Sequence, residues 1–206
     1  MQEQSTTSHL PIYTIGHGAR SIEQFISLLQ QYHIQFLIDV RSQPHSRIHQ
    51  QFSRNELEHT LKQHEFRYIF MGETLGGRPA DSTCYVDGKV SYELVREKGF
   101  FQQGIRRLRT AWEKQLPVAL MCAETKPQEC HRSKLIGNAL LEQGIEVAHI
   151  DELGELKMQD DINDMLRDKQ LSLFDLPDFP STRNKKLNYS RKKYEPRESN
   201  AEGGGA

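Results

Sequence analysis

The chain has 206 residues, 36% of them apolar, and its formal net charge of −1 averages an acidic stretch over residues 151–164 with a basic segment over residues 183–197. This composition suits one domain with an extension and excludes a membrane-spanning protein, because no run approaches the roughly 18 apolar residues that a spanning helix needs. The first residues lack the features of a secretory signal, and three cysteines are too few for a disulfide framework, so we expect a cytoplasmic protein with reduced thiols.

The first half of the chain alternates apolar strands with amphipathic helices. Residues Pro11–Ile15 predict a buried strand, and Ser21 with Gln24 predicts a capping box at the start of the next helix. Residues Ile34–Val40 predict a second strand, whose nearly continuous apolar sequence is typical of a parallel sheet covered on both faces. The pattern continues with a helix over Asn55–His64 and a short strand over Phe66–Phe70.

The second half resumes this alternation after a long irregular stretch that contains Gly76-Gly77-Arg78-Pro79. Helical periodicity from Phe101 to Trp112 precedes the clearest buried strand, Pro117–Met121. A second helix carries Leu135, Ile136, Ala139 and Leu140 and ends before Gly144, and a last strand covers Ile145–Ile150.

Strands that alternate with helices predict an α/β fold, a Rossmann-like open and mostly parallel sheet with helices on both faces. We expect a flexible N-terminus over residues 1–10, the α/β domain over residues 11–155 and a tail over residues 156–206. After a short helix the tail becomes rich in Lys and Arg and poor in apolar residues, which predicts a disordered basic segment.

Reactive side chains follow three of the predicted strands. His17 follows the first strand, Asp39 and Arg41 lie at the end of the second, and Cys122 and Glu124 follow the strand Pro117–Met121. Because ligands bind outside the carboxyl ends of the strands in open α/β sheets, this pattern predicts one functional site there.

The segment Cys130-His131-Arg132 opens the helix after that strand. A helix N-terminus favours anions and, with neighbouring cations, lowers the pKa of a thiol, which makes Cys130 a candidate nucleophile. Arg132 is a candidate for holding a phosphate or carboxylate by two hydrogen bonds.

Other interpretations of the same residues stay open. Cys122 is equally typical of a small buried apolar residue, Glu124 with Arg132 of a structural ion pair, and His17 of a core histidine. Two thiols, a carboxylate and an imidazole also suit zinc or iron, but the C-x7-C-H spacing matches no standard zinc motif. We therefore predict no cofactor and rank a metal second.

Five segments of the chain carry a specific pattern, namely TIGHG, LIDVRSQPHSR, LGGRP, MCAETKPQECHRSKLIGNAL and EVAHI. Together they resemble the bacterial domain of unknown function 488 family. The resemblance covers residues Ile12 to Ile150, and the C-x-E-x2-P-x2-C-H-R block is its most specific part.

This resemblance implies a Rossmann-like fold but no reaction. It implies a site at nine positions, namely His17, Asp39, Arg41, Arg78, Cys122, Glu124, Cys130, His131 and Arg132. The chain departs from the family pattern at Gly18, where many relatives have Ser, and in the insertion-like segment STCYVDGKVSYELV. The Gly76-Gly77 pair is interpreted as a turn.

The tail contains the pentapeptide Gln170-Leu171-Ser172-Leu173-Phe174, which resembles the short peptides that dock on the bacterial DNA sliding clamp. Leu171, Leu173 and Phe174 would fill an apolar pocket while Gln170 hydrogen-bonds at its rim. The alternative is that the apolar side chains pack back on the domain. Seven Lys and Arg residues interleaved with Tyr189 and Tyr194 follow, a pattern that suits DNA or a merely solvated segment.

We therefore expect an enzyme that acts on DNA or nucleotides, in repair or base modification. The candidate catalytic residues are Cys122, Glu124, Cys130, His131 and Asp39; the candidate substrate-binding residues are His17, Arg41, Arg78 and Arg132. The rival functions are a non-catalytic DNA-associated adaptor that senses a nucleotide or metal, and a metal-dependent hydrolase.

Overall fold

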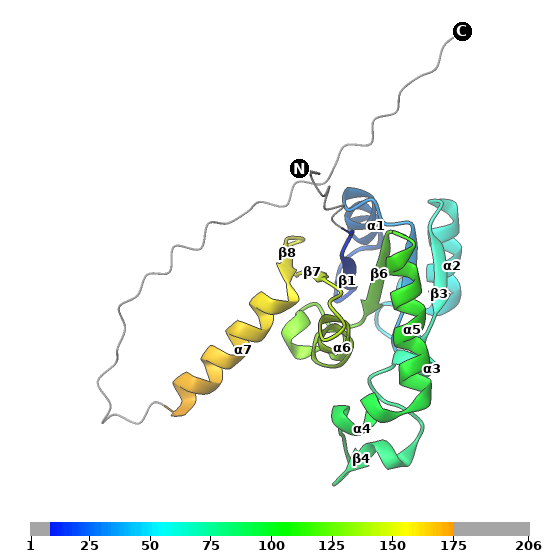
Figure 1. Cartoon of the computed structure of the whole chain (residues 1–206). Coiled ribbons are helices and arrows are strands. Elements are labelled where there is room, and N and C mark those ends of the chain that lie inside the picture. The colour runs from blue at the N-terminus through cyan, green and yellow to red at the C-terminus, as the bar shows by residue number, and fades with distance from the viewer. Residues whose placement is uncertain (1–8, 175–206) are drawn as a thin grey trace, which may run out of the picture.

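A computed structural model describes residues 9–174 of the chain, with side chains up to residue 168. Its centre is a six-stranded sheet with the order β3-β2-β6-β1-β7-β8 (Figure 1). The strands are β1 (Ile12–Gly16), β2 (Phe36–Asp39), β3 (Arg67–Phe70), β6 (Val118–Cys122), β7 (Val147–Ile150) and β8 (Leu156–Met158). All neighbouring pairs are parallel except β7 with β8, so the predicted α/β fold with a mostly parallel sheet is confirmed.

Helices connect the strands and cover both faces of the sheet. The α-helices are α1 (Ile22–Gln31), α2 (Arg54–Gln63), α3 (Gly72–Leu75), α4 (Tyr92–Glu97), α5 (Gly99–Glu113), α6 (Asn138–Leu141) and α7 (Gln159–Phe174). The short 3-10 helices are η1 (Gln50–Phe52), η2 (Ser82–Cys84) and η3 (Pro127–Glu129), and η4 (Arg132–Gly137) is a π-helical stretch that runs into α6. None of the helices in the described part of the chain is long and apolar enough to cross a bilayer.

Alternate side chains of the strands build two apolar cores, one on each face. In β6, Ala119 and Met121 pack on the face covered by α1 and α2, whereas Val118, Leu120 and Cys122 pack on the face covered by α5 and α6. Since both faces are buried, every residue of β6 has to be apolar or small, and its sequence VALMC meets that demand.

Local sequence signals fix several helix ends as predicted. Ser21 and Gln24 form the expected capping box of α1 through reciprocal hydrogen bonds of 3.2 and 3.0 Å. Gly144 has a φ angle of +72°, a left-handed conformation that glycine adopts without strain, and it follows the α6 helix as predicted.

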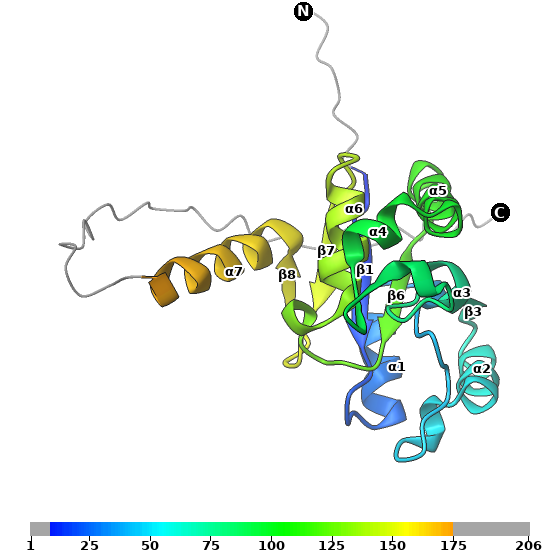
Figure 2. The same ribbon diagram turned by 90° about the horizontal axis from the view of Figure 1, so that it is seen from below.

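The structure adds elements that the periodicity did not predict. The long irregular stretch contains a two-stranded hairpin, β4 (Tyr85–Val86) with β5 (Lys89–Val90), and the short helix α4. At the edge of the six-stranded sheet, β8 pairs antiparallel with β7. Both additions are too short or too weakly periodic to give a signal in sequence. The short helix predicted for the start of the tail is present as α7, which has 16 residues and projects away from the sheet (Figure 2).

Candidate functional site

Three neighbouring strands end at one edge of the sheet and carry most of the predicted site residues. The order β2-β6-β1 places the ends of these strands side by side, so that Asp39, Cys122 and His17 lie at the same edge. The backbone N–H of His17 donates to Cys122 O at 3.0 Å, and the N–H of Val40 donates to Met121 O at 3.0 Å. These hydrogen bonds extend the parallel ladders past the strands and hold the three loops together.

Arg41 is a buried cation held in one orientation. Its Nε and Nη2 donate to the two carboxylate oxygens of Asp39 at 2.9 and 2.6 Å. The Tyr68 hydroxyl donates to the same carboxylate at 2.8 Å, so Asp39 is fully engaged. Because Asp39 is also completely buried, the structure places it behind Arg41 and away from the solvent. It does not bring Asp39 to a position from which a substrate proton is within reach.

His17 supports Arg41 from the other side. Its ring stacks on Phe52 with 4.4 Å between ring centroids, and its Nδ1 lies 3.0 Å from Gly18 O. A carbonyl only accepts, so Nδ1 carries the proton and Nε2 is left to accept from Arg41 Nη1 at 3.4 Å. Burial lowers the pKa of His17 to about 4, which keeps the ring neutral in this role.

Two thiols and a carboxylate form a second group beside Arg41. Cys122 Sγ and Cys130 Sγ are 2.8 Å apart, and Cys130 Sγ donates to Glu124 Oε2 at 3.2 Å. Both cysteines are buried, with 0% and 1% exposure, whereas Glu124 is exposed. The structure therefore brings these three predicted residues into direct contact, with the carboxylate on the solvent side.

Cys130 and Glu124 differ in their protonation. Burial raises the pKa of the Cys130 thiol, and the neighbouring Cys122 raises it further, so the expectation that the helix start lowers this pKa is wrong. For Glu124, partial burial pushes the pKa up, but hydrogen bonds from Cys130 and the backbone outweigh it and leave the pKa below its usual value. At neutral pH Cys130 is a thiol that donates to an ionised Glu124.

Arg132 is completely buried and organises the loop after β6. Its Nη1 donates to Glu124 O and to Cys122 Sγ at 2.6 and 3.0 Å, and its Nη2 donates to Thr125 O at 2.6 Å. Gly16 lies against the same groups, where a Cβ would collide with Glu124 O. Although the sequence suggested a substrate contact, the structure does not bring Arg132 to the cavity, because the loop carbonyls and a sulfur atom engage its Nη1 and Nη2 groups.

His131 contacts both the loop after β2 and the thiol of Cys130. Its Nε2 lies 3.0 Å from Val40 O and must donate there, which leaves Nδ1 unprotonated and facing Cys130 Sγ at 3.6 Å. Burial lowers the pKa of His131, so the ring is neutral. The ring packs on Gly77, where any Cβ would collide with it, so the second glycine of the LGGRP segment does more than form a turn.

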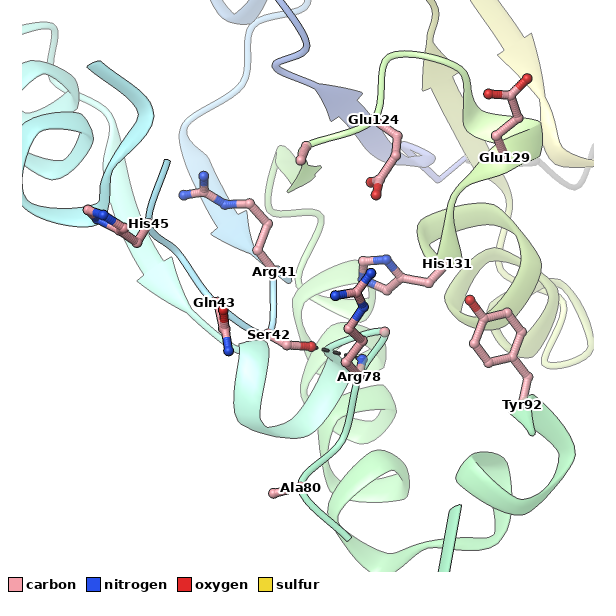
Figure 3. A pocket seen from close by; sticks show the side chains of 12 residues that line it. Arg41, Ser42, Gln43, His45, Arg78, Ala80, Tyr92, Glu124, Glu129 and His131 are labelled. Atoms are coloured by element: carbon pink, nitrogen blue, oxygen red, sulfur yellow. Dashed lines mark hydrogen bonds between the residues drawn. The ribbon is translucent and has the colours of Figure 1, made fainter. Parts of the chain in front are cut away.

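These residues border a cavity of about 680 Å³ at the carboxyl edge of the sheet. The cavity is lined by Arg41, Ser42, Gln43, His45, Gly77, Arg78, Ala80, Tyr92, Ala123, Glu124, Glu129 and His131. Figure 3 shows the Arg78 guanidinium group and the Glu124 carboxylate pointing toward one another, whereas Arg41 lines the cavity with its guanidinium group turned away from them. A cation from the loop after α3, Arg78, thus faces a carboxylate from the loop after β6, Glu124.

Eight of the twelve lining residues were not predicted as site residues, and five of these have polar side chains, namely Ser42, Gln43, His45, Tyr92 and Glu129. Ser42 positions Arg78, because its hydroxyl accepts from the Arg78 backbone N–H at 2.9 Å (Figure 3). Ser42, Gln43 and His45 directly follow Arg41, so their place after a strand end was a usable signal. Tyr92 comes from the insertion-like segment and gave no such signal.

The donor atoms of Cys122, Glu124 and Cys130 all lie within 4.8 Å of one another. Two thiolates and a carboxylate are donors that zinc and iron accept, so the chemistry of this set fits a thiophilic metal ion. Within residues 9–168, where side chains are described, this is the one group of three or more Cys, His, Asp or Glu residues close enough to share an ion.

The predicted clamp-binding peptide lies at the C-terminal end of the part of the chain that the structure describes. The backbone of Gln170–Phe174 forms the end of α7. The side chains of Gln170, Leu171, Leu173 and Phe174 lie outside the described residues, as does the whole basic segment over residues 183–197.

Comparison with known proteins identifies a family and no closer relative. The family described as "Domain of unknown function DUF488" matches residues 21–140, more than half of the chain. The searches of curated proteins and of solved structures found no match to the chain. The matched range includes the loops after β2 and β6 that form the cavity.

Proposed function

Since the chain belongs to the DUF488 family, whose description assigns no reaction, we propose an activity from the cavity itself: an enzyme that acts on a phosphate-bearing substrate, a nucleotide or DNA. One observation carries the proposal. Arg41, Arg78 and the ionised Glu124 line one cavity at the carboxyl edge of the sheet, where the Arg78 guanidinium group faces the Glu124 carboxylate.

Arg41 and Arg78 form the anion-binding side. Guanidinium groups bind phosphate oxygens through short, charge-assisted hydrogen bonds. Asp39 and His17 hold Arg41 before any ligand arrives, and Ser42 holds the Arg78 backbone, so little conformational entropy is lost on binding. Asp39 neutralises part of the Arg41 charge, which leaves Arg78 as the less compensated cation.

Glu124 is the group that we assign to proton transfer. It is ionised at neutral pH, as a general base that removes a proton from water or from a substrate hydroxyl has to be. Both thiols are buried, and Cys130 is protonated, so we assign Cys130 a positioning role through its S–H···Oε2 hydrogen bond. A substrate phosphate on Arg41 and Arg78 would lie across the cavity from this base.

Binding is tested first, with the full chain and a panel of nucleoside mono-, di- and triphosphates and short DNA. Arg78→Ala should weaken binding of the best ligand about 10- to 100-fold, the equivalent of one or two lost charge-assisted hydrogen bonds. Arg106→Ala is the matched control, because Arg106 is an exposed arginine of α5 that does not line the cavity. Equal affinities of the two variants, measured by calorimetry, would remove the proposed phosphate site.

Catalysis is tested on whichever ligand is turned over. Glu124→Gln should lower kcat about 10²- to 10⁴-fold with little change in KM, as expected for a lost general base. Cys130→Ala should lower kcat far less and move the acidic limb of the pH–rate profile upward, because Glu124 loses its S–H donor. A complete loss of turnover in folded Cys130→Ala would instead assign the thiol as the nucleophile.

The tail sequence supports DNA as the molecule on which the enzyme acts. The pentapeptide Gln170–Phe174 is proposed to dock on the sliding clamp, and the basic segment after it to contact the phosphate backbone. The double variant Leu173→Ala, Phe174→Ala of the full chain should then lose at least tenfold in affinity for purified clamp, with an unchanged Tm. An unchanged affinity would leave the cavity without a link to replicating DNA.

A metal-dependent hydrolase is the second candidate function, favoured by the Cys/Glu/Cys donor set. Zinc or iron held by Cys122, Glu124 and Cys130 would supply a Lewis acid next to the phosphate-binding arginines. Elemental analysis of protein purified without chelators should then show about one equivalent of metal, and the Cys122→Ala variant should lose it. Active protein that contains no metal would exclude this function.

A further inference from the structure

The two thiols behind Glu124 are arranged for a reaction that neither proposed activity requires. We propose that Cys122 and Cys130 are a redox-active pair, which a hydroperoxide oxidises reversibly to an intramolecular disulfide. The inference concerns a covalent modification of the chain itself. Only its consequence for Glu124, described below, rests on the proposed function.

The geometry of the pair carries the inference. The two Sγ atoms are 2.8 Å apart, whereas a disulfide bond is about 2.05 Å long, so the sulfur atoms need to approach by less than about 1 Å. Cys122 ends β6 and Cys130 precedes η4, so the fold has already closed the loop between them. Both cysteines are free in the described structure, as is the third, Cys84.

The surroundings supply the groups that the chemistry needs. Arg132 Nη1 donates to Cys122 Sγ at 3.0 Å, and an adjacent guanidinium is one of the groups that stabilise a thiolate. On the other sulfur, Cys130 S–H points to the Glu124 carboxylate at 3.2 Å, which is placed to accept its proton. One sulfur thus has a cation beside it and the other has a base.

The reaction balances with hydrogen peroxide as the oxidant. The Cys122 sulfur, after losing its proton, attacks one peroxide oxygen, the O–O bond breaks, and the released hydroxide takes up that proton to leave as water. The Cys122 sulfenic acid is then attacked by the Cys130 sulfur, whose proton passes to Glu124 and on to the departing hydroxide. Overall, two thiols and one hydrogen peroxide give one disulfide and two waters.

Access for the oxidant is through the cavity. Ala123 and Glu124, the residues that follow Cys122, both line it, and the Glu124 carboxylate contacts Cys130 Sγ, so the thiol pair lies next to the cavity wall. Larger disulfide reagents are excluded by the burial of both thiols. The proposed modifier is therefore a peroxide and not a bulky thiol–disulfide exchange partner.

Oxidation would also change the site in front of the pair. A disulfide has no S–H, so Glu124 would lose the hydrogen bond that Cys130 donates to its carboxylate. If Glu124 is the general base, its carboxylate is then held less firmly in the oxidised enzyme, and turnover should fall. This makes the thiol pair a peroxide-sensitive regulator of the cavity.

The test uses the reduced full chain, treated with a molar excess of hydrogen peroxide, then unfolded and alkylated for intact-mass and peptide analysis. Of the three thiols, only Cys84 should remain available, with a mass lower by about 2 Da before alkylation, and dithiothreitol should restore all three. The Cys84→Ala variant should still form the link, whereas Cys122→Ala and Cys130→Ala should not.

Three results would overturn the proposal, and none depends on a substrate or on a variant that folds. They are three free thiols in the peroxide-treated wild-type chain, a linkage that includes Cys84, or a bound metal ion that persists through purification and protects both thiols. If the disulfide forms while turnover by the reduced and oxidised chains is identical, the thiol pair stands and its regulatory consequence is wrong. Failure of the nucleotide or DNA screen would affect neither result.

Discussion

Two clusters of buried polar side chains lie on the same sheet, and they differ in whether they reach the solvent. The first, which we call the open cluster, consists of Asp39, Arg41, Cys122, Glu124 and Cys130 at the carboxyl edge of β2 and β6, and it borders the cavity. The second, the sealed cluster, consists of Thr14, His149, Gln159 and Ser133, which are all buried.

The sealed cluster forms its hydrogen bonds among its own members and, through Gln159, with Asn138 and Asn163. The Thr14 hydroxyl lies 2.6 Å from His149 Nδ1, and His149 Nε2 lies 2.8 Å from Gln159 Oε1. The Gln159 amide then donates to Ser133 Oγ at 3.1 Å, so the network joins β1, β7, η4 and α7. Gly137 makes room for it, because a Cβ there would collide with Gln159.

This difference distinguishes buried polar groups that stabilise the fold from buried polar groups that support the cavity. Buried polar groups are stable only when they are paired, and the sealed cluster pairs them with one another. In the open cluster the buried residues Asp39, Cys122 and Cys130 position side chains that line the cavity. Variants of the sealed cluster should therefore change stability alone, and variants of the open cluster should change ligand binding.

The largest expected effect is a pH dependence of stability that comes from the sealed cluster. Burial lowers the pKa of His149 to about 3, from an unfolded value of 6.5, so between these values the unfolded chain binds the extra proton. Stability should fall as the pH drops from 6.5 toward 3, by on the order of 3–5 kcal/mol. Urea unfolding at a series of pH values measures this slope.

His149→Gln serves as the control for this slope. It should be less stable at pH 7 but lose less stability on acidification than the wild-type chain. His17→Gln should flatten the slope to a smaller degree, because the pKa of His17 is lowered only to about 4. Parallel pH profiles for wild type and His149→Gln would show that this histidine is not buried in its neutral form.

A smaller effect is expected when the centre of the sealed cluster is removed. Gln159→Ala should cost about 2–3 kcal/mol in unfolding free energy, because it leaves the His149 N–H and the Ser133 hydroxyl without partners. Gln63→Ala, an exposed glutamine of α2, should stay within about 0.5 kcal/mol. Affinity for the cavity ligand should be the same in both variants, and a drop confined to Gln159→Ala would join the two clusters functionally.

The smallest expected effect lies at the back of the open cluster. Tyr68→Phe removes the hydroxyl that donates to Asp39 and should weaken phosphate-ligand binding about 2- to 10-fold through a less firmly held Arg41. Tyr32→Phe removes a comparable hydroxyl, which donates to Gly154 O at 2.7 Å away from the cavity. Calorimetry that finds equal affinities for these two variants would contradict a positioning role of Tyr68.

Elements with strong local signals were predictable and cover most of the domain. The five parallel strands are runs of mostly apolar residues, and α1 has a capping box. The hydrophobic pattern and the cap residues therefore predict the bounds of these elements to within two residues of those observed. β8 and the hairpin of β4 with β5 are only two or three residues each, and no periodicity exists at that length.

The site was predictable in position but not in the role of each residue. Strand ends and the C-x-E-x2-P-x2-C-H-R segment indicated where His17, Arg41 and Glu124 belong. The sequence did not show that Arg132 turns inward to the loop carbonyls, or that desolvation outweighs the helix start at Cys130. Both outcomes depend on which atoms surround a side chain in three dimensions.

The sequence by itself thus determined the α/β architecture, the family and the edge of the sheet that carries the reactive side chains, because these follow from periodicity and from order along the chain. Only the tertiary structure decided that Glu124 faces the cavity while Cys122 and Cys130 meet behind it, and that Thr14, His149 and Gln159 form a closed network. Burial and pairing set the charge of each group, and both are properties of contacts between residues as far as 135 positions apart.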